Sequence, residues 1–374
     1  MTRRAAFLAL VASCCSAASA SASPPPPVRA PAWLVENANG EVLAASHAVD
    51  RRAIASITKL MTVLVVLDHR SLGDVVTIDR RSADVGQESI ALEPGEQLTV
   101  ADLIRGALIQ SANDAAVALA LSTSPDLTAF ANLMNAKAKA LGLDHTHFVR
   151  PDGLDAPDEY STAADVTTLA RDAMQVPFIR ATVQQRTAAI AGGRTLHTWN
   201  DLLGIFPGVI GVKTGHTDNA GWSQVLADIR GPVTLYATIL GSPTRGERNA
   251  DLERLVNWGF RQYVVVEAIA AGRSYAEVQL PYGQGRLALV ARTPLTATVR
   301  PGRALTERVV ASRAATLPVM QGQVLGHVEV WSGKELLGRR ALVASRSVAR
   351  PGVVGRARWY AARTIHHIGG LLQR

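Results

Sequence analysis

A serine and a lysine, Ser56 and Lys59, open an apolar stretch at residues 54–67. The three-residue offset puts both side chains on one face of a helix, so that the lysine amine can touch the serine hydroxyl. Serine becomes a strong nucleophile when an adjacent base takes its proton, and lysine is such a base once burial lowers its pKa. The pair predicts acyl transfer through Ser56. A helix cap followed by an exposed lysine would give the same pattern.

A second polar group, Ser111-Ala112-Asn113, interrupts the apolar pattern of residues 100–121. Buried polar side chains are costly unless they have partners. In a catalytic interpretation, Ser111 passes a proton between Lys59 and a leaving amine, and the Asn113 amide bonds the substrate backbone or Lys59. The alternative is a break in the helix followed by a new N-cap.

A third group, residues 211–217, has glycines on both sides of Lys213 and precedes a strand-like run. A glycine such as Gly215 lets a backbone edge come close to a ligand. An extended edge of this kind can align a peptide by strand addition, with Lys213, Thr214 and Thr217 donating hydrogen bonds to a carboxylate. A surface turn that enters a hairpin is the alternative interpretation.

The elements that must hold these residues alternate between strands and helices. Helical patterns cover residues 54–67, 100–121, 126–141, 162–173 and 251–263. Strand patterns bounded by tight turns cover residues 33–35, 41–44, 221–229 and 233–240. Residues 31–263 are therefore expected to form an α/β domain in which an antiparallel sheet is packed with helices. The short alternating runs of residues 264–346 predict a small all-β domain.

The N-terminal residues have the pattern of a secretory signal. Residues 1–20 combine Arg3 and Arg4 with a short apolar run and end in small residues, and a Pro-rich leader follows at residues 21–30. The apolar run is too short to span a bilayer. We expect an exported protein that works in the periplasm or at the outer face of the cytoplasmic membrane.

Both cysteines of the chain, Cys14 and Cys15, lie inside this segment. Cleavage after Ala20 would leave a mature chain without cysteine and hence without a disulfide. Residues 11–14 also resemble a lipoprotein cleavage box, in which Cys14 would become a lipidated N-terminus. The sequence leaves both forms of processing open.

The C-terminal residues 351–374 suggest an amphipathic helix. Apolar residues such as Trp359 and Ile365 recur at three- to four-residue intervals, with arginines between them. A basic helix of this kind can lie in a membrane interface. A helix that packs on its own domain has the same pattern, and Gly369 and Gly370 weaken it.

Composition narrows the range of partners. The chain has 374 residues, which suits two domains, and a formal net charge of +8 with lysine and arginine scattered along it. A mildly basic, exported protein suits work beside anionic envelope polymers, and nucleic acid is not an expected partner. The histidines at 145, 147, 366 and 367 come without a recognisable third ligand. We therefore expect no metal site and no cofactor.

The three polar groups also carry a family resemblance. Ser56-x-x-Lys59, Ser111-x-Asn113 and Lys213-Thr214-Gly215, in this order, resemble the signatures of penicillin-recognising serine enzymes. The wider chain is similar to the D-alanyl-D-alanine carboxypeptidases among the low-molecular-mass penicillin-binding proteins. The strings that add to this resemblance are Leu103-Ile104-Arg105-Gly106, Asp114-Ala115, His216-Thr217, Ala220-Gly221 and Trp258-Gly259-Phe260-Arg261.

The resemblance implies a reaction and roles. Ser56 would attack the carbonyl between the two terminal D-alanines of a peptidoglycan stem pentapeptide, with Lys59 as the base, and water would hydrolyse the acyl-enzyme. The backbone N–H groups of Ser56 and His216 would form the oxyanion hole. Arg248 matches an arginine that helps to hold the substrate carboxylate, although by itself it is equally a surface charge. β-Lactams, as mimics of the terminal dipeptide, would acylate the same serine.

Departures from the family pattern leave other activities open. Asp152 stands where some members have histidine, which could alter how deacylation is tuned. A class A β-lactamase would need a Glu-x-x-Leu-Asn string, and Asp158-Glu159-Tyr160 does not fit it. An endopeptidase that acts on cross-links is close in chemistry. A non-catalytic peptidoglycan-binding scaffold is less consistent with an intact set of nucleophile and base.

Overall fold

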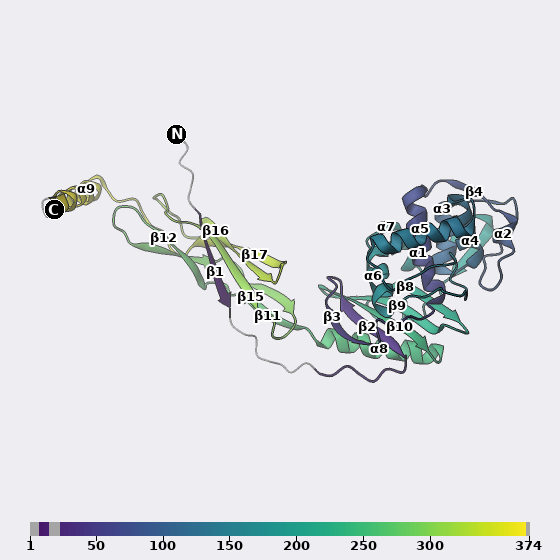
Figure 1. The fold of residues 1–374 in the computed structure, drawn as a ribbon. Helices are drawn as coiled ribbons and strands as arrows, with labels where there is room; N and C mark the ends of the chain where they lie inside the picture. The colour runs from purple at the N-terminus through teal and green to yellow at the C-terminus, as the bar shows by residue number, and fades with distance from the viewer. Residues whose placement is uncertain (1–6, 15–22, 372–374) are drawn as a thin grey trace. The chain divides into compact units, whose positions relative to one another are not determined.

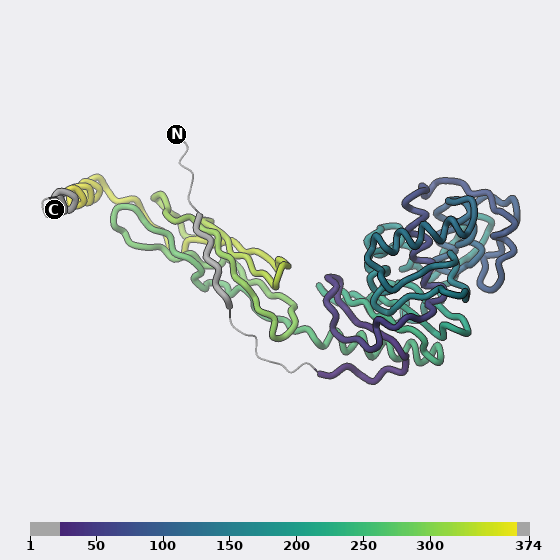
Figure 2. Tube along the Cα trace, viewed as in Figure 1, coloured from purple at the N-terminus to yellow at the C-terminus, as the bar shows by residue number. Residues whose placement is uncertain are grey.

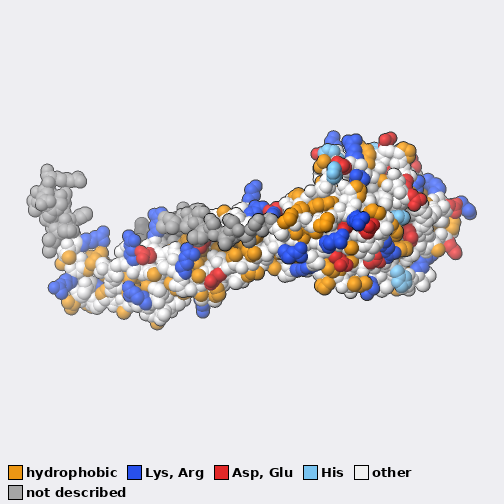
Figure 3. Space-filling model, turned by 90° about the horizontal axis from the view of Figure 1, so that it is seen from below, with side chains coloured by type: hydrophobic (Ala, Val, Ile, Leu, Met, Phe, Trp, Pro, Cys, Tyr) orange, Lys and Arg blue, Asp and Glu red, His pale blue; other side chains and the backbone are white. Residues whose placement is uncertain are grey.

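The computed structural model describes residues 7–14 and 23–371. The chain divides into two compact units, Pro24–Arg261 and a second that joins Met1–Ser23 to Gln262–Arg374. Lys and Arg side chains are interspersed with acidic and apolar ones on the face shown in Figure 3, in keeping with their scatter along the sequence. Each unit has its own apolar core.

The first unit is built on an antiparallel sheet whose strand order is β3-β2-β10-β9-β8 (Figure 1). The strands are β2 (Ala32–Asn37), β3 (Val42–Ser46), β8 (Val209–Thr217), β9 (Gly221–Arg230) and β10 (Val233–Ser242). β2 and β10 lie side by side although they come from opposite ends of the unit, with Trp33 opposite Ile239 (Figure 2). β8 is an edge strand, so one side of its backbone is not used by the sheet.

Helices cover both faces of this sheet. On one side lie α1 (Lys59–His69), α3 (Val100–Ile109), α4 (Asn113–Thr123), α5 (Leu127–Ala140), α6 (Ala163–Ala173) and α7 (Pro177–Val183), which share the larger core. α8 (Arg245–Arg261) packs on the opposite face through Leu252, Leu255 and Val256. It begins earlier than the predicted residue 251, because Thr244 accepts a hydrogen bond from Glu247 N and donates one to the Glu247 carboxylate.

Short elements complete the first unit around the helices. They are the 3₁₀ helices η1 (Ala55–Thr58) and η2 (Ala191–Gly193), the strands β4 (Val75–Thr77), β5 (Gln97–Thr99), β6 (Thr187–Ile190) and β7 (Arg194–His197), and the helix α2 (Arg80–Ala83). The small strands pair as β4-β5 and β6-β7.

Two predicted helices are interrupted, and both interruptions carry a serine. The single helix expected over residues 100–121 is wrong: α3 ends at Ile109, Ser111 has a left-handed backbone with φ of 64°, and α4 starts at Asn113. Residue 54 does not begin an α-helix either, since Ala55 is left-handed and Ser56 lies in η1, ahead of α1. Periodicity missed both breaks because the flanking residues on each side are buried and apolar.

In its described residues, the second unit is all-β apart from its last helix. Its strands are β1 (Phe7–Cys14), β11 (Val264–Ile269), β12 (Ser274–Gln279), β13 (Arg286–Ala291), β14 (Leu295–Val299), β15 (Leu305–Ser312), β16 (Val324–Ser332) and β17 (Glu335–Ala344). They form a sheet of order β1-β15-β16-β17-β13-β12 and a β11-β14 pair. The predicted fold class, an α/β layer structure followed by a small all-β part, is confirmed.

The described parts of the segments expected to direct export and anchoring, residues 7–14 and 351–371, belong to this second unit. β1 pairs antiparallel with β15, while the expected cleavage site after Ala20 lies outside the described residues. α9 (Val353–Leu371) begins beside the β12–β13 hairpin, where the ring centroids of Trp359 and Tyr282 are 5.6 Å apart. No helix within residues 7–14 and 23–371 is long and apolar enough to cross a membrane.

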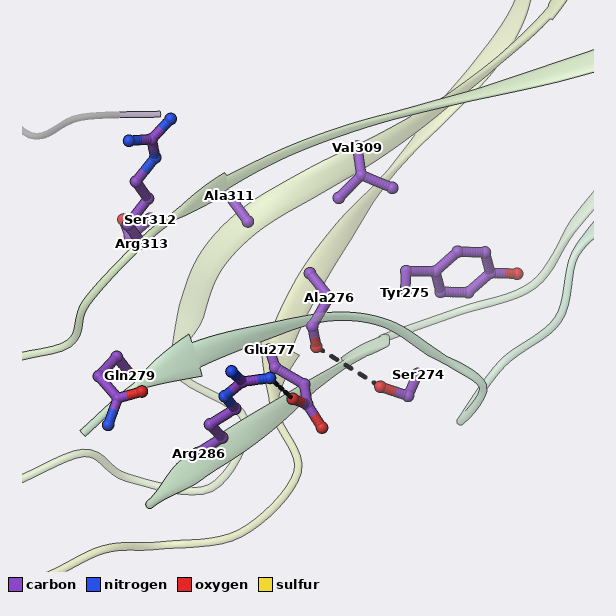
Figure 4. A pocket seen from close by; sticks show the side chains of 10 residues that line it. All are labelled: Ser274, Tyr275, Ala276, Glu277, Gln279, Arg286, Val309, Ala311, Ser312 and Arg313. Carbon is purple, nitrogen blue, oxygen red and sulfur yellow. Dashed lines mark hydrogen bonds and ion pairs between the residues drawn. The ribbon is translucent and has the colours of Figure 1, made fainter. Parts of the chain in front are cut away.

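A cavity of about 550 Å³ lies between β12 and β15 in the second unit (Figure 4). Its charged lining residues include Glu277 and Arg286, whose side chains pair at 3.3 Å on the exposed surface. None of the predicted site residues lines it. The chemistry predicted from the sequence has to be sought in the first unit.

Candidate active site

Lys59 is the centre of the polar cluster in the first unit. The side chain is fully buried, and Nζ lies 2.7 Å from Ser56 Oγ, 2.7 Å from Asn113 Oδ1 and 2.6 Å from the Asp152 carbonyl oxygen. Burial lowers the pKa of Lys59 to about 8, against the opposing effect of nearby carboxylates, first among them Asp152. An amine in this state can accept a proton from the Ser56 hydroxyl near neutral pH.

A second lysine–serine pair faces the same region. Lys213 Nζ lies 2.8 Å from Ser111 Oγ and 2.9 Å from the Thr214 carbonyl oxygen, and its side chain is almost completely buried. Burial, followed by the charge of Lys59, lowers the pKa of Lys213 well below its usual value. The left-handed backbone of Ser111 leaves this hydroxyl in the gap between α3 and α4, where it reaches Lys213.

The structure contains the predicted break at Ser111-Ala112-Asn113 and the predicted contact of Asn113 with Lys59. The helix does break there, as the structural alternative held, but no side-chain cap closes the start of α4 at Ala112. Instead the Asn113 side chain accepts from Lys59 and donates to the Gly86 carbonyl oxygen at 3.0 Å. The polar side chains are directed at the two lysines rather than at their own helix.

Two glycines let the backbone segments of the site meet. A Cβ on Gly215 of β8 would lie 2.6 Å from the Ile54 carbonyl oxygen and 3.2 Å from Ser56 N. Gly153 has φ of 75°, and a Cβ there would lie 2.1 Å from the Ala55 carbonyl oxygen. Any side chain at either position would push its segment away from the turn that carries Ser56.

Arg248, predicted at the carboxylate end of the site, is 1% exposed and stands over the Trp222 ring at 5.8 Å. Its Nη2 donates to Asp201 at 3.1 Å and to Asn249 Oδ1 at 2.7 Å, while Nε also donates to Asn249. Within the described residues, Nη1 makes no hydrogen bond. Burial lowers the pKa of Arg248 to about 10, so the guanidinium stays charged at neutral pH.

These groups surround a cavity of about 220 Å³. The lining residues are Ser56, Gln87, Glu88, Ser111, Trp199, Thr214, Gly215, His216, Trp222 and Arg248. Three other predicted residues lie behind this lining. Lys59 donates to Ser56 and Lys213 donates to Ser111, while Asn113 accepts from Lys59. Thr217 instead donates to Asp155 Oδ1 at 2.7 Å, which leaves it aimed at a neighbouring loop.

Four lining residues were missed in the sequence. Trp222 stacks on the His216 ring, with ring centroids 4.0 Å apart, and Trp199 also lines the cavity. Gln87 and Glu88 enter through a loop whose Gln87 backbone is left-handed, with φ of 65°. No local pattern marks these residues, because tertiary contacts alone bring them to the cavity.

Asp114 holds the loop that carries Gln87 and Glu88 through hydrogen bonds. This carboxylate is fully buried and accepts hydrogen bonds from Ser89 Oγ and from the backbone N–H groups of Ile90 and Leu92. The Glu88 carbonyl oxygen in turn accepts from Asn113 N at 2.7 Å. Asp114 therefore connects the loop with the cavity-lining residues Gln87 and Glu88 to the first turn of α4.

The chain matches the D-alanyl-D-alanine carboxypeptidase family over residues 18–244 and the C-terminal domain of penicillin-binding protein 5 over residues 263–350. The carboxypeptidase DacA of Escherichia coli K12 is 31% identical over 354 residues, covering 89% of this chain and 87% of its own. Penicillin-binding protein 5 of Haemophilus influenzae has a TM-score of 0.64 at 27% identity, over 88% of this chain and 100% of its own. The Streptomyces K15 DD-transpeptidase has a TM-score of 0.61 at 32% identity, over 64% of this chain and 100% of its own.

Matches of this extent cover both units, and they agree with the resemblance drawn from the three serine and lysine signatures. The protein belongs to the D-alanyl-D-alanine carboxypeptidase family and is a serine-type hydrolase of that class.

Proposed function

We propose that this enzyme removes the terminal D-alanine from peptidoglycan stem pentapeptides through an acyl-enzyme on Ser56. The observation that supports this most directly is the 2.7 Å contact between the buried Lys59 amine and the Ser56 hydroxyl at the wall of the cavity. With a pKa of about 8, about a tenth of Lys59 is neutral at pH 7 and available as a base.

In the acylation step, neutral Lys59 takes the Ser56 proton while Ser56 Oγ bonds to the carbonyl carbon of the scissile peptide bond. The N–H groups of Ser56 and His216 stabilise the oxyanion. The proton then passes through Ser111, which lies beside Lys213, to the nitrogen of the leaving D-alanine, and the C–N bond breaks. In deacylation, water adds to the ester carbonyl, Lys59 takes its proton, and Ser56 leaves with a proton restored.

Substrate binding uses the free edge of β8 and the polar groups around it. The backbone beside Gly215 aligns the stem peptide by strand addition, and Asn113 bonds its backbone. Lys213, Thr214 and Thr217 hold the terminal carboxylate together with Arg248, whose Nη1 lies free of the described residues. Thr217 has to exchange its bond to Asp155 for one to the substrate.

Benzylpenicillin tests this function because a β-lactam mimics the terminal dipeptide. We expect intact-mass spectrometry to show one benzylpenicillin per chain, mapped to the peptide that contains Ser56, and a pentapeptide to release free D-alanine. Addition of glycine as an acceptor amine separates hydrolysis from the transfer named for the Streptomyces relative. A folded protein that forms no adduct and releases no D-alanine would contradict the proposal.

Removal of the Arg248 charge is expected to weaken substrate capture. Arg248→Gln should lower kcat/KM for a pentapeptide by about tenfold to a hundredfold, because a charged hydrogen bond to the carboxylate is lost. Most of the loss should be in KM. Arg245→Gln is the matched control, since Arg245 shares Asp201 with Arg248 but does not line the cavity. Equal losses in both variants would show that Asp201, rather than substrate, is the partner that matters.

The proposal extends to the location of the enzyme. Residues 1–20 direct export and residues 21–30 form the leader, so that the domains at 31–263 and 264–346 work in the periplasm on peptidoglycan. Residues 351–374 lie along the membrane surface through their apolar face. The mass of the mature protein distinguishes a chain that starts at Ser21 from one that starts at a lipidated Cys14.

A further inference from the structure

Two carboxylates, Asp152 and Glu159, lie beside Lys59 outside the residues that line the active-site cavity. Asp152 is fully buried, and its carbonyl oxygen is the third acceptor of the Lys59 amine. Glu159 is half-buried and reaches the turn that carries Lys59 through Thr58. The proposed reaction uses neither carboxylate directly.

The charge of Asp152 is matched by a cation. Arg150 donates to both of its carboxylate oxygens, at 2.9 and 2.8 Å, and Leu154 N donates at 3.1 Å. Burial opposes ionisation, but the bonds from Arg150 hold the pKa of Asp152 below its usual value. Asp152 is therefore an anion throughout the physiological range.

Glu159 has weaker partners. One carboxylate oxygen accepts from Thr58 Oγ1 at 3.2 Å and the other from Arg150 N at 3.0 Å. Among the described residues, no cationic side chain forms an ion pair with it. Burial raises the pKa of Glu159 to about 7, the nearby charge of Asp152 acts in the same direction, and the Thr58 hydroxyl opposes them. Its charge therefore changes near neutral pH.

The charges that face Lys59 come from several segments of the first unit. They are Asp152, Glu159, Glu88 and Asp114, which all favour the ammonium form, and Lys213, which opposes it. Glu159 itself faces Asp152 and Arg150. An anion beside the amine makes deprotonation of Lys59 harder, so ionised Glu159 restrains the base and neutral Glu159 releases it.

We propose that Glu159 is a positioning residue for acylation, which fixes the Lys59 turn through Thr58 and whose negative charge holds the Lys59 amine protonated over part of the working pH range. The inference rests on the proposed function, because penicillin acylation through Lys59 is its readout. Asp152 supplies a constant field at the same amine, while Glu159 supplies one that depends on pH.

The test is the pH profile of the acylation rate constant for benzylpenicillin in wild type and Glu159→Gln. Loss of the charge should move the midpoint of the acid limb to lower pH and raise the rate by about twofold to threefold between about pH 7 and 8, where wild-type Glu159 is ionised and Lys59 is still largely protonated. Near pH 6, where wild-type Glu159 is already mostly neutral, the two rates should be nearly equal. The rate on the alkaline plateau should stay within about twofold of wild type. Glu159→Asp, which keeps the charge, should restore most of the wild-type acid limb.

Asp158→Asn is the matched control, since Asp158 is the exposed neighbour in the same turn and does not appear among the charges that act on Lys59. An acid limb that stays in place in Glu159→Gln, or moves equally in Asp158→Asn, would overturn the inference. A wild type that is never acylated would instead refute the proposed function.

Wild-type protein offers a second test that does not depend on a folded variant. The Lys59 side-chain NMR signal, recorded in lysine-labelled enzyme, should titrate in two steps, because Glu159 and Lys59 sense each other. A single step would overturn the inference even if Glu159→Gln failed to fold.

Discussion

Ser56→Ala should take up no benzylpenicillin and should lose at least about 10⁴-fold in D-alanine release, because the hydroxyl that forms the ester in the proposed reaction is lost. Ser56 lies in the η1 turn, and the only side-chain hydrogen bond of its hydroxyl among the described residues is with Lys59. Its removal should leave the thermal midpoint close to that of wild type. Intact-mass spectrometry, a D-alanine release assay and circular dichroism measure the three quantities.

Ser111→Ala is the comparison for this variant. It keeps the nucleophile and the base but removes the hydroxyl beside Lys213, so an adduct should still form, more slowly and still on Ser56. An adduct of full stoichiometry on Ser56→Ala would contradict the assignment of the nucleophile.

The second large effect is expected at Lys59. Lys59→Ala should slow acylation by about 10³-fold or more, since general-base catalysis and the activation of Ser56 are lost together. Asn113 Oδ1 and the Asp152 carbonyl oxygen lose a donor, and each unsatisfied acceptor costs about 1–3 kcal/mol. The protein should therefore fold with a lower thermal midpoint, which a thermal melt records.

Wild type should show the matching pH dependence. Burial lowers the pKa of Lys59 to about 8, so the acylation rate should rise as pH increases through that value and level off above it. Lys59→Ala should lose this limb. Covalent labelling of Lys59→Ala at the wild-type rate would show that another group is the base.

Residue types and spacing predicted the contact between Ser56 and Lys59, but they did not predict the element that carries Ser56. The offset between Ser56 and Lys59 predicts contact on a regular helix, and the contact exists, although Ser56 lies in a 3₁₀ turn before the α-helix begins. The contact survives because a 3₁₀ turn also brings residues three apart onto one side. The spacing was informative even where the element was assigned wrongly.

Contacts between distant segments could not be predicted in this way. Lys213 of β8 bonds Ser111, which lies between α3 and α4, and Asp201 accepts a hydrogen bond from Arg248 across 47 residues of sequence. Glu159 was set aside because it fits no β-lactamase string, yet its contact with Thr58 brings it beside the base. Such pairings depend on how the sheet and helices pack, and local periodicity carries no information about that.

The left-handed backbone of Ser111 has a consequence for how the sequence can change. A non-glycine residue in this conformation costs about 1–2 kcal/mol, and glycine would avoid most of that cost. Glycine would also remove the hydroxyl that meets Lys213. The proposed reaction needs this hydroxyl, so thermal stability and turnover favour different residues at position 111.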